Sequence, residues 1–445
     1  MLHEQVHFGF CSSPAISKNV IVVPDNYTKI SWAVGNASEG DTILVRPNTY
    51  YESNIVVNKT VTIVGENPET TLVDGASTME GIFFVTRSNV MIENLTIQNT
   101  SSTGFVPAVW LSNVENVTVR KVKIRNAVYG VEIKSSNFTK ILYSRISETF
   151  NCAIYVWSKS YSSTIVGNTL ESNPTAIIIT DVESKFSKIY HNNFINNTQP
   201  DQVWFNAISY FDNDYPSGGN YWSNHAAPDL KSGPYPQNQN GSDGILDESY
   251  PSGVSLPWDK YPLAHPLTTL EVAAEGECFE VQVSTNSSLN SYNFSIEAKK
   301  LTLFLNGTES TNGSCRVSIP KRLLSCEPPS QWNVSLYNGE QITYLAQEDG
   351  DNTYLYFAYN HSSTGEIKIK GTKAIPEFPN ITVLIILLTI VTLATAIFKA
   401  KLIKMNKKIN PELSSTYRNY VLRLQAKPHI LRFRLSTFYS NLNME

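Results

Sequence analysis

The chain has 445 residues, of which 41% are hydrophobic, and a formal net charge of −4. This length exceeds that of one ordinary domain. The charge is unevenly placed, because residues 399–445 hold ten Lys and Arg against two Glu and the remainder therefore carries −12. An acidic body with a basic tail argues against a nucleic-acid partner and for two different compartments.

Residues 1–18 are left unassigned. They have no basic stretch followed by a long apolar core, which is not the pattern of a signal peptide. Either the start is truncated or mis-assigned, or export uses another signal, and we expect a truncated start. Residues 20–24 predict a short strand. The next apolar residues recur at helical spacing: Ile30, Ala33, Val34 and Ala37. We expect this short helix to cover the open end of the structure that follows.

A stacked repeat occupies residues 89–206. Five lines of sequence end at apolar residues spaced 27, 22, 24 and 24 apart: Ile97, Ile124, Ile146, Leu170 and Phe194. A second apolar track has spacings of 22, 23, 23 and 26: Val109, Val131, Ile154, Ile177 and Val203. Within each line the apolar residues alternate as in strands. The repeat predicts an all-β fold, a right-handed parallel β-helix over residues 19–206, with an internal ladder of Asn168 and Asn192.

These lines resemble the repeats of the NosD-like right-handed β-helix proteins, also called carbohydrate-binding and sugar-hydrolysis repeats. The resemblance covers residues 19–265, and the stretch from Val22 to Asn67 is similar to the opening segment of archaeal members. Residues 220–224, 241–247 and 259–263 resemble the closing motif of the family. The resemblance implies a protein that binds polysaccharide or acts in the cell envelope or in adhesion. The alternative that it implies is a polysaccharide lyase or glycoside hydrolase on the same scaffold.

Three further segments follow the repeat. Residues 207–265 are rich in Tyr, Trp, Pro, Gly and Asn, which predicts a loop-rich cap. Residues 268–372 contain alternating apolar runs and predict a small β-sandwich. Residues 373–380 are the linker to the next segment.

A transmembrane helix is predicted at residues 381–398, which are uncharged and nearly all apolar. Eighteen helical residues span about 27 Å, close to the thickness of a bilayer core. Lysines follow at once, so the positive-inside rule places the tail 399–445 in the cytoplasm and the preceding domains outside. The linker and helix resemble archaeal surface-protein anchors, and we expect membrane lipid to be a partner of this helix.

Sequons and cysteines fit an exported protein. Sixteen N-x-[ST] sites occur before residue 381, and the predicted glycosylation sites include Asn94, Asn116, Asn286, Asn306 and Asn333. The chain has five cysteines. Cys315 and Cys326 flank a short loop of the predicted sandwich and are the expected disulfide.

A basic stripe is the first candidate site. Lys121, Lys123 and Arg125 alternate onto one face, and Arg145 follows Lys123 at the repeat spacing. Such a stripe would hold uronate or sulfate groups, so we expect acidic polysaccharide to bind more weakly as salt rises. A solvated face is the commoner origin of such charge runs. Trp204 and Trp222 would stack on sugar rings.

Two oxygen-rich clusters are the other candidates. Asp201, Asp212 and Asp214 approach the spacing of glycosidase acid–base pairs, although plain turn chemistry is the preferred interpretation. A calcium site, without EF-hand spacing, is conceivable at four residues: Asn238, Asn240, Asp243 and Asp247. Only His191 lies within the repeat, so a copper site is poorly supported. The sequence contains no complete catalytic constellation.

Overall fold

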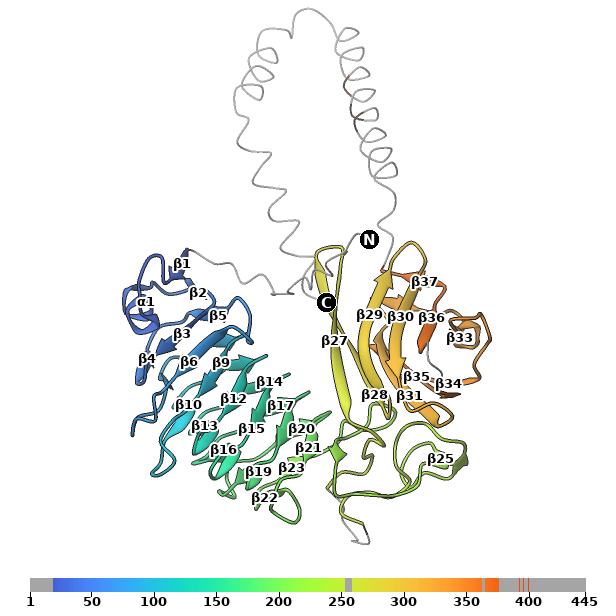
Figure 1. Cartoon of the computed structure of the whole chain (residues 1–445), viewed down its shortest axis with the longest axis horizontal. Helices are drawn as coiled ribbons and strands as arrows, with labels where there is room; N and C mark the ends of the chain where they lie inside the picture. The colour runs from blue at the N-terminus through green and yellow to red at the C-terminus, as the bar shows by residue number, and fades with distance from the viewer. Residues whose placement is uncertain are drawn as a thin grey trace, which may run out of the picture. The chain divides into compact units, whose positions relative to one another are not determined.

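The computed structural model describes residues 19–252, 258–361 and 365–375, together with Thr392, Thr395 and Lys399. From residue 20 onward, short strands stack in parallel into three sheets that run along a right-handed β-helix (Figure 1). From residue 42 to residue 205, each coil contributes one strand to sheet A, then one to sheet B, then one to sheet C. The predicted all-β fold is therefore confirmed for this part of the chain.

The strands of the three sheets are short. Sheet A contains β1 (Val20–Val23), β2 (Thr42–Val45), β5 (Thr62–Gly65), β8 (Met91–Glu93), β11 (Thr118–Arg120), β14 (Lys140–Leu142), β17 (Thr164–Val166), β20 (Ser187–Tyr190) and β23 (Ser209–Tyr210). Sheet B contains β3 (Asn48–Tyr51), β6 (Thr71–Asp74), β9 (Thr96–Gln98), β12 (Lys123–Arg125), β15 (Arg145–Ser147), β18 (Thr169–Glu171), β21 (Asn193–Ile195) and β24 (Tyr221–Trp222). Sheet C contains β4 (Ile55–Val57), β7 (Phe83–Val85), β10 (Pro107–Ser112), β13 (Tyr129–Lys134), β16 (Cys152–Trp157), β19 (Thr175–Ile179) and β22 (Val203–Phe205).

Both apolar tracks of the sequence are columns of the core. In sheet B, Ile124 pairs with Ile146 and Ile146 with Leu170, and all three side chains are buried. In sheet C the second track pairs in register from Val109 to Val203. Because a parallel register aligns equivalent residues at every coil, one apolar position in each repeat produces one continuous column.

Amide ladders fill two corners inside the β-helix. Asn168 Nδ2 donates to Asn192 Oδ1 at 2.9 Å, and Asn192 Nδ2 donates to Asn220 Oδ1 at 3.0 Å. The backbone N–H of Asn220 donates to Asp259 Oδ2 at 2.7 Å, which ends this ladder. A second ladder contains Asn173, Asn197 and Gln202. The predicted ladder is confirmed, and its stacked amides satisfy one another where water cannot reach.

The first coils are covered by α1 (Ile30–Asn36), the helix that the sequence predicted. Its Ile30, Ala33 and Val34 are buried in the core of the β-helix. The carboxylate of Glu52 accepts hydrogen bonds from the backbone N–H groups of Ile30 and Ser31, at 2.7 and 3.0 Å. These bonds satisfy donors that a helix N-terminus leaves unpaired.

Residues after Trp222 form a cap and an antiparallel sandwich. The cap contains β25 (Lys231–Ser232) and β26 (Gln239–Asn240). One sandwich sheet contains β27 (Leu267–Ala274), β28 (Glu277–Thr285), β31 (Asn312–Pro320), β35 (Asn352–Asn360) and β34 (Tyr344–Glu348). The other contains β29 (Ser288–Ser295), β30 (Lys300–Asn306), β36 (Glu366–Lys370) and β33 (Asn333–Leu336), with β32 (Leu324–Ser325), η1 (Pro329–Gln331) and β37 (Lys373–Ala374) beside them. A separate apolar core lies between the sheets.

The predicted membrane anchor lies almost entirely outside the described residues. Within the described part of the chain, no helix is both long and apolar enough to cross a bilayer. Only Thr392, Thr395 and Lys399 of the region beyond residue 375 are described.

Candidate functional site

The basic stripe is present, but its charges are already paired. Lys123 and Arg145 stack in register on the outer face of sheet B, as predicted. Lys123 forms an ion pair with Glu69, and Arg145 forms one with Glu171. The guanidinium of Arg125 donates to Gln98 Oε1 at 2.7 and 2.9 Å. We call Lys123, Arg125 and Arg145 the basic column. It offers little uncompensated charge to an anionic ligand, and it lines a cavity of only about 180 Å³.

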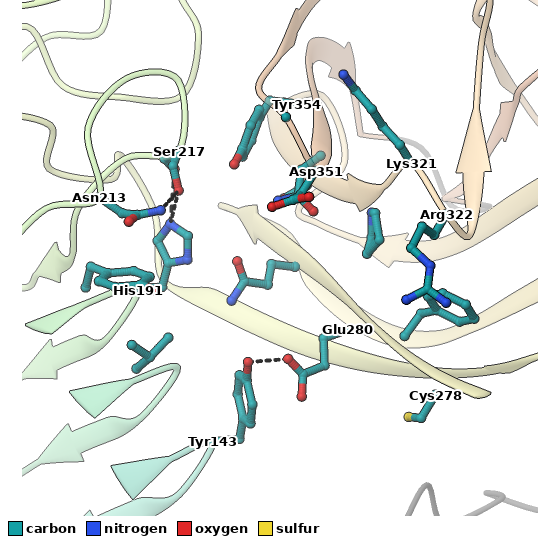
Figure 2. A pocket seen from close by; sticks show the side chains of 18 residues that line it. Tyr143, His191, Asn213, Ser217, Cys278, Glu280, Lys321, Arg322, Asp351 and Tyr354 are labelled. Atoms are coloured by element: carbon teal, nitrogen blue, oxygen red, sulfur yellow. Dashed lines mark hydrogen bonds between the residues drawn. The ribbon is translucent and has the colours of Figure 1, made fainter. Parts of the chain in front are cut away.

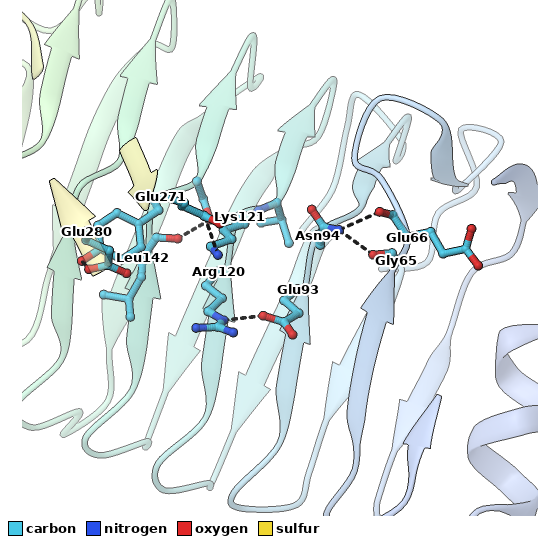
Figure 3. Close-up of polar contacts among 12 residues, drawn as sticks. Gly65, Glu66, Glu93, Asn94, Arg120, Lys121, Leu142, Glu271 and Glu280 are labelled. Carbon is cyan, nitrogen blue, oxygen red and sulfur yellow. Dashed lines mark hydrogen bonds and ion pairs between the residues drawn. The ribbon is translucent and has the colours of Figure 1, made fainter. Parts of the chain in front are cut away.

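Lys121 does not share that face, because it lies in the bend between sheets A and B. Its φ is +52°, and equivalent positions of the neighbouring coils share this left-handed conformation: Asn94, Tyr143, Gly167 and His191. We call these five residues the bend column. Lys121 forms an ion pair with Glu271 of β27 (Figure 3). The strict alternation assumed from the sequence was wrong here, since the bend adds a residue that breaks the period of two.

The bend column is the surface on which the sandwich packs. Tyr143 donates its hydroxyl hydrogen to Glu280 of β28, and its ring lies over Gly167, where an added Cβ would be 2.3 Å from a ring carbon. Beside them lies a cavity of about 600 Å³ lined by both parts (Figure 2). Nothing in the sequence indicated this junction, because partners such as Tyr143 and Glu280 lie 137 positions apart.

Several polar groups of this cavity pair with other groups of the chain. His191 Nε2 lies 3.1 Å from the carbonyl oxygen of Ser217, and burial lowers the pKa of His191 to about 4. Across the cavity, Arg322 pairs with Glu277 and Lys321 pairs with Glu348, at 2.6 and 3.1 Å. Burial raises the pKa of Glu280. We regard the cavity as a structural junction.

Of the three catalytic candidates, two are exposed and Asp212 is half-buried. Asp212 Oδ1 accepts the backbone N–H of Asp214 at 3.2 Å, and its Oδ2 accepts that of Lys260 at 3.1 Å. Asp214 has a φ of +56° and is exposed, as is Asp201. These contacts are those of a turn, which the sequence analysis preferred.

The four calcium candidates comprise two exposed amides and two carboxylates that are buried or half-buried. Asn238 and Asn240 are exposed, whereas Asp243 is buried and accepts the N–H of Ile245 at 3.0 Å. Asp247 accepts the N–H groups of Leu230 and Lys231. Within the described residues, no group of three or more His, Cys, Asp or Glu is arranged to hold a metal ion.

The cysteine prediction was wrong, whereas most of the predicted sequons are accessible. Cys315 and Cys326 are free and buried. The strand β31 continues past Cys315 to Pro320, so the two cysteines do not flank a short loop. Cys278 is the described cysteine that is disulfide-bonded. Four predicted glycosylation sites are exposed: Asn116, Asn286, Asn306 and Asn333. Asn94 is half-buried, and its Nδ2 donates to the carbonyl groups of Gly65 and Glu66 (Figure 3).

The two predicted sugar-stacking tryptophans have opposite environments. Trp222 pairs in register with Phe194 and continues the inward column of sheet B, so it is only 1% exposed. Its ring stacks between Phe194 and Tyr250, and its Nε1 donates to Asp259 at 2.9 Å. Trp222 is therefore a core residue and cannot meet a ligand. Trp204, in β22, is 48% exposed.

Trp204 ends a column on the outer face of sheet C that the sequence analysis missed. In register along the sheet, this aromatic column contains Phe84, Trp110, Glu132, Tyr155, Ile178 and Trp204. Each member from Trp110 onward follows directly after a residue of the second apolar track, so the sequence did contain the signal. Phe105, Tyr129 and Trp157 add further rings beside Tyr155, and Phe105 is 48% exposed.

A polar group lies inside this aromatic face. Glu132 is fully buried, and its Oε1 accepts the Nε1–H of Trp157 at 2.8 Å. Neither Glu132 Oε2 nor the Nε1–H of Trp110 has a hydrogen-bond partner within the described structure. Lys134 Nζ lies 4.7 Å from the ring of Trp157 and 5.8 Å from that of Trp110. Burial raises the pKa of Glu132 to about 7, although Lys134 opposes this shift.

These features define a right-handed parallel β-helix with one covered and one open outer column. Residues 13–227 match the family model described as NosD, periplasmic copper-binding protein. Over this stretch, just under half of the chain, the protein is NosD-like, and its described fold is a parallel β-helix. The described residues do not fit a copper site, because His191 is turned toward Ser217 and no cluster of ligating side chains surrounds it.

Solved structures share the architecture only distantly. A pectate lyase, Pel9A, is 15% identical, with a TM-score of 0.35 over 46% of this chain and 58% of that chain. The catalytic domain of a GH87 α-1,3-glucanase in complex with nigerose is 15% identical, with a TM-score of 0.31 over 52% and 51%. A pectin methylesterase mutant in complex with a hexasaccharide is 12% identical, with a TM-score of 0.32 over 46% and 73%. Scores this low support no functional argument, and no curated protein matches the chain.

Proposed function

We propose that this protein binds polysaccharide chains on the outer face of sheet C. The observation that supports the proposal is the aromatic column, which joins exposed rings to hydrogen-bonding groups without partners. Aromatic faces are electron-rich, so they pack well against the C–H face of a sugar ring. A few placed polar groups then fix the orientation of such a ligand. Trp110 Nε1 and Glu132 Oε2 are groups of this kind.

The basic column is the less suitable surface. Its cations have acidic or amide partners, so an anionic glycan would have to displace them. The acidic polysaccharide expected from the sequence is therefore replaced in our proposal by a ligand held through aromatic contacts.

A glycan panel tests the proposal. The full chain, purified in mild detergent, should retain at least one polysaccharide, and Tyr155→Ala should weaken retention about tenfold, as for a central aromatic anchor. Phe186→Ala, which removes another exposed ring away from the column, should leave retention unchanged. If no glycan is retained, the proposal is wrong. New reducing ends or unsaturated products that disappear in Glu132→Gln would replace binding by catalysis.

We propose in addition that the protein is anchored in the cell envelope, with its β-helix outside and its tail 399–445 inside. The apolar run at residues 381–398 and the lysines that follow support this orientation. The exposed sequons agree with it. Protease added to intact cells should remove epitopes before residue 370 and spare an epitope fused after Glu445. The reverse pattern would contradict the orientation.

A further inference from the structure

The aromatic column alternates along the β-helix. Trp110, Tyr155 and Trp204 belong to β10, β16 and β22, which are every second strand of sheet C. Glu132 and Ile178 occupy the two coils between them. Because neighbouring strands lie about 4.8 Å apart, the three rings recur about every 9.6 Å and span about 19 Å along the β-helix axis.

The charges of this face do not favour an anionic ligand. Lys134 is the cation beside the column, and it lies over the rings of Trp110 and Trp157, two residues from Glu132 on the same strand face. A glycan carboxylate placed at Lys134 would also approach the carboxyl group of Glu132, whose ionised form it would repel. A hydroxyl group can both accept from Trp110 Nε1–H and donate to Glu132 Oε2. Both atoms are buried. Because the Nζ of Lys134 lies over the rings of Trp110 and Trp157, its flexible side chain would have to shift for a ligand to reach them.

We infer, on the basis of the proposed function, that the ligand is an extended, uncharged β-1,4-linked glycan lying along the β-helix axis. In such a chain each sugar is turned by half a revolution relative to the previous one. The same ring face therefore returns at every second sugar, with a repeat comparable to two coils of the β-helix. Sugars one, three and five would then contact Trp110, Tyr155 and Trp204. An α-1,4-linked chain curls and does not keep this repeat.

Calorimetry with defined oligosaccharides tests this geometry. Cellotetraose reaches two of the three rings at a time, and cellohexaose reaches all three. The full chain should therefore bind cellohexaose about tenfold more tightly than cellotetraose. Trp204→Ala should lose this gain with length, whereas Phe186→Ala should keep it. Maltohexaose and hexagalacturonate should each bind at least about tenfold more weakly than cellohexaose.

Different failures have different meanings. If the gain with length persists in Trp204→Ala, or if maltohexaose or hexagalacturonate binds most tightly, the inferred ligand class is wrong. If another glycan binds and Tyr155→Ala weakens it, only the inferred geometry fails and the proposed function remains. If Tyr155→Ala affects no glycan, the proposed function fails too. Loss of a dimer in Trp204→Ala, without glycan binding, would identify the face as a contact between copies and overturn both.

Discussion

Two outer columns of the same β-helix differ in what covers them. The bend column meets β27 and β28, where Lys121 pairs with Glu271 and Tyr143 pairs with Glu280. The aromatic column leaves Trp204 half exposed and leaves Trp110 Nε1 without a partner. Lys121 and Tyr143 of the covered column thus find their partners in the chain's own sandwich. We infer that in this β-helix the aromatic column, with exposed rings beside unpaired polar atoms, is a better binding surface than the paired charges of the basic column.

The largest expected effect concerns the core beneath both columns. Ile146 is fully buried and in register with Ile124 and Leu170. Ile146→Asp should unfold the β-helix, because an unpaired buried charge costs several kcal/mol. Lys140→Asp makes a similar change at an exposed strand position and should leave the protein folded. Circular dichroism would check this, and a soluble, fully folded Ile146→Asp protein would reject the register.

The second prediction concerns the buried carboxyl of the aromatic column. The pKa of Glu132 is about 7 in the folded protein, against 4.5 as its ordinary value. Between these values the unfolded chain loses the proton first, so the stability of the native protein falls as pH rises. Glu132→Gln should match the native protein near pH 4 and exceed its free energy of unfolding by about 3 kcal/mol near pH 8.

Urea unfolding at both pH values would measure this difference. Asp259 and Asp229 also have pKa values raised to about 7, but they are present in both proteins and cancel in the comparison. Glu148→Gln, at an exposed position, is the matched control. A difference between Glu132→Gln and the native protein that does not change with pH would contradict the burial of an ionisable Glu132.

The third prediction sharpens the account of the bend column. Gly167 has a φ of +72°, and a Cβ there would overlap the ring of Tyr143. Gly167→Ala should cost about 1–2 kcal/mol for the left-handed backbone alone, and more for the overlap. Gly276 has a similar φ of +79°, and an added Cβ there would meet only open space, so Gly276→Ala isolates the backbone cost. Equal losses of stability in the two variants would show that Tyr143 is not packed on Gly167.

The smallest expected effect is the coupling energy of the ion pair that joins the sandwich to the bend column. A double-mutant cycle with Lys121→Ala and Glu271→Ala should give a coupling energy of about 1 kcal/mol or less, because the pair is only partly buried. The coupling should decrease in about 1 M salt. Coupling of zero at low salt would indicate that this contact does not hold the sandwich on the β-helix.

The sequence predicted the interior better than the exterior. The first apolar track, which contains Ile124, Ile146 and Leu170, is visible because each inward position repeats in every coil. Predicting the outward positions requires the register of each strand. The sequence analysis did not foresee the bend at Lys121 and therefore placed this residue on the wrong face. Trp222 was misjudged because a longer spacing after Phe194 hid its place in the same inward column.

The candidate site was missed for a different reason. Trp110, Glu132 and Tyr155 are unremarkable one by one, and only their shared register makes them a column. The sequence provided that register through the second apolar track, but the basic residues were the more conspicuous pattern. The junction with the sandwich could not be predicted, because contacts such as Tyr143 with Glu280 depend on how two separate cores pack.

The salt dependence of glycan binding tests the central claim most directly. The dissociation constant of the full chain for the retained glycan should change less than about twofold between about 0.1 M and about 1 M salt, because aromatic contacts and hydrogen bonds to neutral hydroxyls are barely screened. Trp110→Ala should weaken binding about tenfold at both concentrations, and Arg145→Ala should leave it unchanged. Binding that falls steeply with salt and is lost in Arg145→Ala would place the ligand on the basic column and contradict the account.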